Sequence, residues 1–202
     1  INAGYRNGIK STDDLKVVSG TYQITAAEDS VIGKDLLGIA DGNFTIKSGT
    51  DGMKSTDDKD TTKGNIIIAG GIFKIEAASD GIQAENILDI QNGTFDITTG
   101  NGSAAVDMKS GDSGAMGGMG TMGVPGQNGS AGTSASSAAT SSDTDSVSMK
   151  GLKASNAIYI CGGTITLDTE DDGIHSNDSI TIESGNISIR SGDDGVHAAV
   201  SY

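Results

Sequence analysis

The sequence predicts an all-β protein, a right-handed parallel β-helix in which a single chain winds through about seven coils of 22 residues. Three observations predict this fold. A period of 22 residues runs along the chain, apolar residues recur two positions apart within each period, and a glycine recurs at one fixed position. Each observation specifies a different part of the coil.

The period is clearest near the end of the chain, where DDGIH at 171–175 and DDGVH at 193–197 repeat the same pattern. Repeat units begin at Gly8, Ser30, Gly52, Gly81, Gly151, Gly173 and Gly195. The steps between these starts are 22, 22, 29, 70, 22 and 22 residues. We therefore expect a short insertion around 58–62 and a long one within 101–149, both added to regular units.

Each unit holds apolar pairs with the two-residue spacing of side chains on one face of a strand. With the unit start as position 0, these pairs occupy positions 7 and 9 and positions 14 and 16, and a further apolar residue stands at position 1. Position 12 is always glycine: Gly20, Gly42, Gly71, Gly93, Gly163 and Gly185. We expect this glycine to supply positive φ between two strands. The unit is too short for a helical repeat and lacks the leucine spacing of leucine-rich repeats, so stacked β-coils about 4.8 Å apart are expected.

Stacking places like residues over like residues, so the coil interior is expected to be built from columns of isoleucine and leucine. Phe44, Phe73 and Phe95 share one position and should form a short aromatic ladder. These columns have a purely structural explanation, because they supply the core.

The charge and composition of the chain indicate which classes of partner it can bind. The formal net charge is −14, which disfavours binding to nucleic acid or to anionic membrane surfaces and favours cations. No apolar run reaches the length needed to cross a bilayer, and the single cysteine, Cys161, excludes an internal disulfide. The chain opens inside a repeat and reads as a processed piece. We expect a monomer with one domain, 1–202.

Stacking also brings acidic residues into vertical columns at three repeat positions. At about 5 Å separation, neighbouring carboxylates repel by several kcal/mol at moderate effective dielectric, so either their pKa values rise or cations lie between the coils. Oxygen ligands at this spacing favour Ca²⁺. The predicted calcium ligands are Asp29, Asp51, Asp80, Asp172 and Asp194 at position −1, Asp171 and Asp193 at position −2, and Asp13, Asp35, Asp57 and Asp178 at position 5. The alternative is that these residues bond backbone groups in turns, which suits Asn86 and Asn156 at position 5.

Position 2 is expected to point outward beside the acids. It holds Lys10, Ile32, Lys54, Gln83, Lys153, His175 and His197. This column either neutralises the carboxylates or forms a polar groove for a sugar or uronic acid, so Lys10, Lys54, Lys153, His175 and His197 are candidate carbohydrate-binding residues. The two histidines could instead bind a transition metal. Cys161, at a turn, is expected to be a small buried residue rather than a nucleophile.

The long insertion, at about 102–149, is rich in Gly and Met and then in Ser, Ala and Thr. Such a segment cannot bury a core, so a disordered loop is expected. Met116, Met119 and Met122 are spaced by three, which could suit Cu(I), but a disordered segment is the simpler interpretation.

The motifs DDGIHS at 171–176, DDGVHA at 193–198, GLKA at 151–154 and GGTITL at 162–167 resemble those of a known family. That family comprises secreted bacterial carbohydrate-binding proteins with a polysaccharide-lyase-like parallel β-helix, and the resemblance covers essentially the whole chain. It implies a secreted or cell-surface protein, calcium held between coils, and binding of cellulose or an acidic polyuronate without cleavage.

Two alternatives to a binding protein remain at this point. Pectate lyases share the fold and use calcium with a basic residue, and here Lys54 or Lys153 could act as the base if its pKa were lowered. The Arg-x-Lys triplet of pectin hydrolases is missing, and the acids obey the repeat, whereas a catalytic site normally interrupts it. A structural or adhesive rod on the cell surface is the other alternative.

Overall fold

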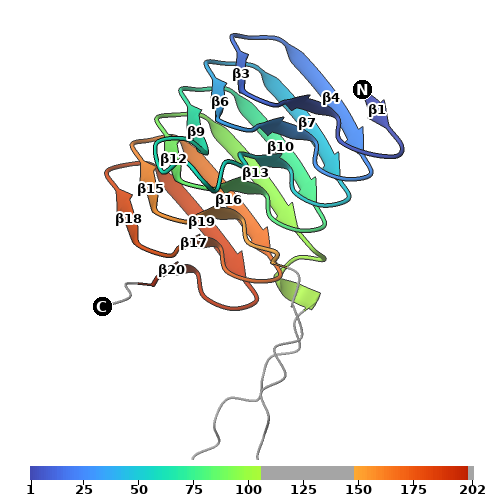
Figure 1. The fold of residues 1–202 in the computed structure, drawn as a ribbon. Helices are drawn as coiled ribbons and strands as arrows, with labels where there is room; N and C mark the ends of the chain where they lie inside the picture. The colour runs from blue at the N-terminus through green and yellow to red at the C-terminus, as the bar shows by residue number, and fades with distance from the viewer. Residues whose placement is uncertain (106–147, 200–202) are drawn as a thin grey trace, which may run out of the picture. The chain divides into compact units, whose positions relative to one another are not determined.

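The structure, a computed structural model, describes residues 1–105 and 148–199, and these residues form an all-β solenoid. Its strands belong to three parallel sheets (Figure 1). Only one 3-10 helix, Ser103–Ala105, accompanies the strands within the described ranges. The fold class predicted from the sequence, a parallel β-helix, is confirmed.

Sheet A contains the longest strands, which come from repeat positions 13–18. Its strands are β1 (Asn2–Ala3), β4 (Thr21–Ala26), β7 (Asn43–Ser48), β10 (Ile72–Ala77), β13 (Thr94–Thr99), β16 (Thr164–Thr169) and β19 (Asn186–Ser191).

Sheet B is built from the short strands around position 1. They are β2 (Ile9–Ser11), β5 (Val31–Gly33), β8 (Met53–Lys54), β11 (Ile82–Ala84), β14 (Leu152–Ala154), β17 (Ile174–Ser176) and β20 (Val196–Ala198).

Sheet C is built from positions 6–9 of each unit. It contains β3 (Asp14–Val17), β6 (Leu36–Ile39), β9 (Asn65–Ile68), β12 (Ile87–Ile90), β15 (Ala157–Ile160) and β18 (Ser179–Ile182).

The register follows the repeat. Ile174 pairs with Val196, which is one period of 22 residues away. Phe95 pairs with Ile165 across the long insertion, so that insertion leaves the coil register intact. Most of the expected loop at 102–149, including Met116, Met119 and Met122, lies outside the described residues. Thr99, just before this loop, donates a hydrogen bond from its Oγ1 to the carbonyl of Met149, the last residue of the loop.

The glycine at position 12 adopts positive φ in all six units, between 97° and 141°. Gly42 shows why another residue would not fit there. A Cβ at this position would lie 2.9 Å from the Phe44 ring and 3.1 Å from the Gly20 carbonyl oxygen. The spacing between turn and strand, which is the same in every coil, therefore depends on a residue without a side chain.

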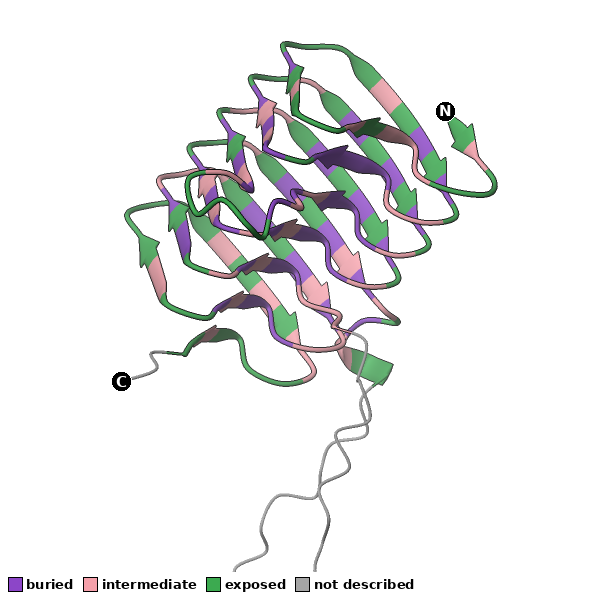
Figure 2. Cartoon of the chain, in the orientation of Figure 1, coloured by how far each residue is buried: buried purple, intermediate pink, exposed green. Residues whose placement is uncertain are grey.

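The core lies inside the coils, and buried and exposed residues alternate along the strands of sheet A (Figure 2). Phe44, Phe73 and Phe95 are at most 1 % exposed and stack with ring centroids 5.0 and 4.7 Å apart. Tyr22 extends this ladder by a fourth ring, 4.7 Å from Phe44. The predicted apolar columns are thus confirmed.

Candidate functional site

The acidic column at position −1 forms a hydrogen-bonded ladder in the N-terminal coils. Asp29 Oδ1 accepts the Asp51 amide at 3.0 Å, and Asp51 Oδ1 accepts the Asp80 amide at 3.0 Å. Asn7 Oδ1 begins the ladder by accepting the Asp29 amide. Each side chain thus binds the backbone of the next coil, which is a structural use of the carboxylate and differs from a bond to its own turn.

Lysines at position 2 neutralise two carboxylates of this column, Asp51 and Asp80. Lys54 Nζ lies 2.7 Å from Asp51 Oδ2, and Lys153 Nζ lies 3.0 Å from Asp80 Oδ2. Both carboxylates are buried, Asp51 at 5 % exposure and Asp80 at 1 %. Among the described residues, Asp29, Asp51 and Asp80 belong to no group of three or more metal-ligating side chains. Their expected role as calcium ligands therefore receives no support from the geometry.

Burial is the strongest influence on the pKa of the Asp51 carboxyl. It raises the pKa of this carboxyl, and the hydrogen bond from Lys54 only partly opposes the shift. For Lys54, burial alone would lower the pKa, but the hydrogen bond to Asp51 and the charges of Asp51, Asp29 and Asp80 outweigh burial and raise it. A lyase base needs a lowered pKa, so this environment gives no support to Lys54 as such a base.

The position 5 column is also satisfied within the protein. Lys34 Nζ lies 2.8 Å from Asp57 Oδ2, and Lys63 Nζ lies 2.7 Å from Asp35 Oδ2. The hydrogen bond from Lys34 lowers the pKa of Asp57, with further hydrogen bonds from the amides of Asp60 and Lys59. Sequence reasoning missed Lys34 and Lys63, although Lys34 directly precedes an acid of the column.

The other members of position 5 contribute no charge cluster. Asn156 Nδ2 donates to Asn86 Oδ1 at 2.6 Å, which is the asparagine ladder that needs no metal. Asp13 and Asp178 are exposed at opposite ends of the column.

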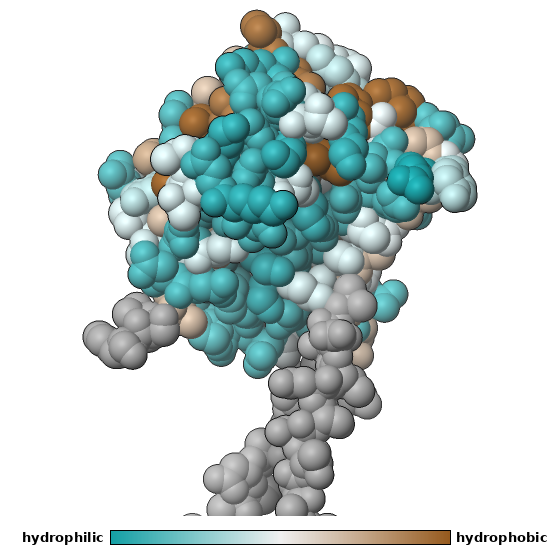
Figure 3. All heavy atoms as spheres, viewed as in Figure 1, coloured by the Kyte–Doolittle hydropathy of each residue, from teal (hydrophilic) through white to brown (hydrophobic). Residues whose placement is uncertain are grey.

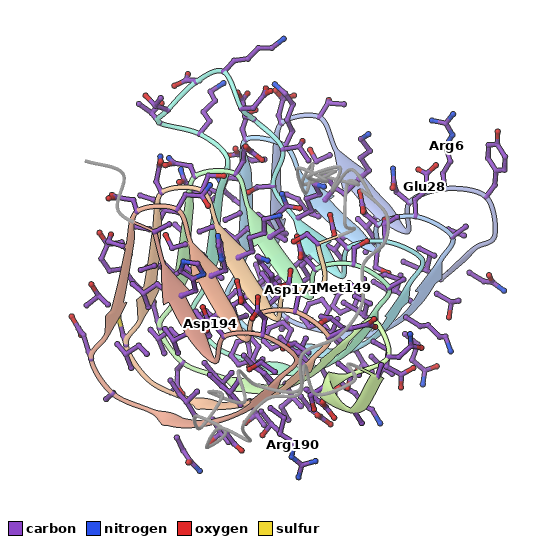
Figure 4. All side chains as sticks on the ribbon, turned by 90° about the horizontal axis from the view of Figure 1, so that it is seen from below. Arg6, Glu28, Met149, Asp171, Arg190 and Asp194 are labelled. Atoms are coloured by element: carbon purple, nitrogen blue, oxygen red, sulfur yellow. The ribbon has the colours of Figure 1, made fainter. Side chains whose placement is uncertain are left out.

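The C-terminal coils differ, because there the acids converge. Ligand oxygens of Asp171, Asp172 and Asp193 all lie within 4.8 Å of one another. Lys150, which stands at position −1 in place of an acid, contacts both Asp171 and Asp172. Burial alone would lower the Lys150 pKa, but the hydrogen bond to Asp171 and its charge raise it. Asp171 lies against the Met149 backbone, as Figure 4 shows, while Asp194 is exposed and is not part of this group.

Two histidines stand beside the same carboxylate. His175 Nδ1 lies 2.7 Å from Asp172 Oδ2, and His197 Nδ1 lies 3.8 Å from that oxygen and 3.4 Å from Asp194 Oδ2. Asp172 is 3 % exposed. Burial would raise the Asp172 pKa, but the hydrogen bond with His175, the Lys150 charge and the Asp194 amide together lower it.

The predicted position 2 column is not uniformly outward and free. Ile32 is buried at 2 % exposure, which corrects the expectation for this residue. Lys54, Lys153 and His175 are held by aspartates, and their side chains are 26 %, 24 % and 15 % exposed. Lys10 is exposed. Neutralisation of the acids, one of the two expected roles, is therefore what Lys54 and Lys153 do.

The outer face of sheet C carries a shallow apolar hollow that sequence reasoning missed. A volume of about 410 Å³ is lined by Asn65, Ile67, Ile87, Asp89, Tyr159 and Cys161. Tyr159 is 40 % exposed and Ile67 is 38 % exposed. Asn65 Oδ1 is buried and has no hydrogen-bond partner among the described residues. The hollow contrasts with the largely hydrophilic face seen in Figure 3.

Aromatic residues make up only 3 % of the chain, which gives little reason to expect an exposed ring on this face. The signal was nevertheless present: Tyr159 stands between Ile158 and Ile160, both of which point into the core, so strand alternation turns it outward. Cys161 is half-buried at the rim of the hollow, and burial raises the pKa of its thiol, which disfavours the thiolate needed of a nucleophile.

Comparison with known proteins adds a family. The model of a family described as "Carbohydrate-binding domain-containing protein" matches residues 1–195. The comparisons with curated proteins and with solved structures gave no match. In the part of the chain that the structure describes, no helix is long and apolar enough to cross a membrane.

Proposed function

The chain belongs to the family of carbohydrate-binding domain-containing proteins, and on this premise we propose that it binds an extracellular polysaccharide without cleaving it. The family match carries the proposal. It spans 1–195 and thus includes the start of every repeat unit, which supports a sugar contact on the solenoid. A stack of similar coils presents one chemical pattern per coil, which suits a repeating polymer.

We place the contact with a neutral polysaccharide of the cellulose type in the hollow on sheet C. Sugar-binding sites combine apolar surface with a few polar groups, and here Tyr159 and Ile67 supply the surface while Asn65 and Asp89 supply the polar groups. The Asp89 carboxylate disfavours a uronic acid at this place, which is why a neutral chain is proposed.

We propose further that binding of an acidic polyuronate depends on calcium. A protein of net charge −14 repels a polyanion. The oxygens of Asp171, Asp172 and Asp193 are a hard-donor set that suits Ca²⁺, and these residues would hold it. Bound there, calcium would supply local positive charge that a uronate could share. Support for this second contact is confined to the C-terminal coils.

Binding without cleavage is proposed rather than lyase chemistry because the ammonium groups of Lys54 and Lys153, the two candidate bases, are paired with carboxylates. Asp51 holds Lys54 and raises its pKa, and Asp80 holds Lys153. The two arginines are also far apart in the fold, since Arg6 precedes the first strand of sheet B and Arg190 lies in β19 (Figure 4). A lyase would release unsaturated products, which absorb in the ultraviolet.

The experiment is a pull-down on insoluble cellulose with wild-type protein, Tyr159→Ala and Tyr5→Ala. Tyr5 is 81 % exposed away from the hollow and provides a matched control for loss of an exposed ring. We expect Tyr159→Ala to weaken retention about tenfold and Tyr5→Ala to leave it unchanged. Equal retention of all three proteins would reject the hollow as the contact, and no retention on any glycan would favour a structural rod.

A further inference from the structure

The geometry points to a transition-metal site, best suited to Zn²⁺, formed by Asp172, His175 and His197 on neighbouring coils. This inference goes beyond carbohydrate binding and does not rest on it. One oxygen of Asp172 and one nitrogen of each histidine lie within 4.8 Å of one another. The two rings stand one coil apart, with centroids separated by 5.0 Å and planes at 71°.

The strands fix these three side chains relative to each other. His175 lies in β17 and His197 in β20, and the two residues are direct partners in the parallel ladder of sheet B. Asp172 is buried, and its other oxygen accepts the Asp194 amide at 3.1 Å. The site therefore rests on hydrogen-bonded backbone from two coils, which is the rigidity that a metal site requires.

In one tautomer of His175, the lone pair of a ring nitrogen is available to a cation. Its Nε2 lies 3.0 Å from Asn177 Oδ1 and its Nδ1 lies 2.7 Å from Asp172 Oδ2, so both ring nitrogens face acceptors. A neutral imidazole carries only one N–H. In the tautomer whose Nε2–H donates to Asn177 Oδ1, the Nδ1 lone pair and the Asp172 oxygen face each other, and both can donate to one metal ion as their separation widens from the hydrogen-bonding distance. An outer hydrogen bond of this kind is typical of metal-bound histidine.

The ligand atoms of this site favour one class of metal ion. Two imidazole nitrogens with one carboxylate oxygen suit Zn²⁺ and similar first-row ions, whereas Ca²⁺ takes oxygen ligands almost entirely. The ammonium group of Lys150 lies 3.4 Å from the same Asp172 oxygen but also contacts Asp171, so that it retains a partner when the metal binds. At the equivalent place in other coils, Lys54 and Lys153 supply a fixed charge and cannot ligate.

The test is isothermal titration of metal-free, tag-free protein with zinc chloride, without calcium and then with excess calcium. The chain has only two histidines and both belong to the site, so their imidazole NMR signals report it directly. We expect one zinc ion per chain, shifts of both imidazole signals, and retention of those shifts in excess calcium, because the calcium ligands share only Asp172 with the zinc site and calcium prefers oxygen to imidazole nitrogen. Substitution with Co²⁺ should give the visible absorption of nitrogen-ligated cobalt.

Variants separate this site from the neighbouring acids. His197→Asn should weaken zinc binding at least tenfold without unfolding the protein, because the side chain is 43 % exposed. Asp193→Asn removes a carboxylate of the acidic group only and should change zinc affinity less than threefold. The proposal is overturned if wild-type protein binds no zinc, if His197→Asn binds it as well as wild type, or if Asp193→Asn is the more damaging change.

Discussion

The N-terminal and C-terminal coils place the same acidic residue at the same repeat position but surround it differently. In the N-terminal coils, Asp51 binds the amide of the next coil and the ammonium group of Lys54. In the C-terminal coils, Asp172 also binds the amide of the next coil, but it faces two histidines and lies beside two further carboxylates. The backbone contact is shared, and only the neighbours of the second oxygen differ.

This difference shows that the repeat determines where a side chain lies and that its neighbours determine what it does. A lysine at position 2 neutralises a buried acid and completes a structural ion pair. A histidine at the same position can give up its proton and leave the carboxylate available to a metal. We therefore regard the N-terminal column as part of the scaffold and the C-terminal group as the candidate metal-binding part.

The largest effect that would sharpen this contrast is stabilisation by calcium. At a hundredfold excess over its dissociation constant, an ion that binds only the folded state adds about 2.7 kcal/mol to the free energy of unfolding. We expect Asp193→Asn to abolish most of this gain, because it removes one of three converging carboxylates. The matched variant Asp29→Asn should keep it. Urea unfolding with calcium and with chelator measures both, and equal gains in the two variants would contradict the contrast.

A second prediction concerns stability in the N-terminal column. Asp51→Ala should lower the free energy of unfolding by about 2 kcal/mol, because it leaves the Asp80 amide and the half-buried Lys54 without their partner. Asp51→Asn keeps the acceptor for the amide and should cost less. Denaturant titration checks the order of the two variants, and an equal loss in both would show that the ladder hydrogen bond is unimportant.

Asp194→Ala should have a much smaller effect on stability than Asp51→Ala. The Asp194 side chain is 63 % exposed and its contact is with half-exposed His197, so a loss below about 0.5 kcal/mol is expected. The same titration provides the value. A loss as large as that of Asp51→Ala would mean that the C-terminal acids are scaffold residues as well.

The dependence on pH should have opposite signs at two buried acids, Asp51 and Asp57. Burial raises the Asp51 pKa, so the stability it contributes is present below the ordinary value of about 4 and falls as the pH rises through the folded value. The Lys34 hydrogen bond lowers the Asp57 pKa, so its contribution is present above about 4 and is lost as the pH falls.

Unfolding measured between about pH 3 and pH 6 tests these signs. Relative to wild type, the deficit of Asp51→Asn should shrink as the pH rises, while the deficit of Asp57→Asn should grow. Parallel profiles for the two variants would show that their environments are alike, contrary to the structure.

Much of the fold follows from the sequence because each coil repeats the same local pattern. The spacing of Gly173 and Gly195 predicts the pairing of Ile174 with Val196, and the glycine at position 12 predicts the positive φ of Gly42. The Phe44 ladder follows for the same reason. These features depend on backbone register alone, which a period of 22 residues specifies.

The candidate site was less predictable because it depends on side-chain partners across coils. The repeat positions of Asp51 and Asp172 were predicted correctly. The lysines that neutralise Asp57 and Asp35, however, stand at repeat positions outside the predicted columns. Lys150 occupies an acidic position after the long insertion, which is visible only when register is carried across that insertion. Tyr159 was missed because composition counts rings and does not say which face they occupy.

Retention on polygalacturonate, measured with calcium and with chelator, tests most directly the proposal that this solenoid binds an acidic polysaccharide through calcium. The charge of −14 opposes binding of a polyanion, so the account predicts retention with calcium and release by chelator. Equal retention in both conditions would contradict the role of calcium. Absence of retention on both polygalacturonate and cellulose would contradict polysaccharide binding itself.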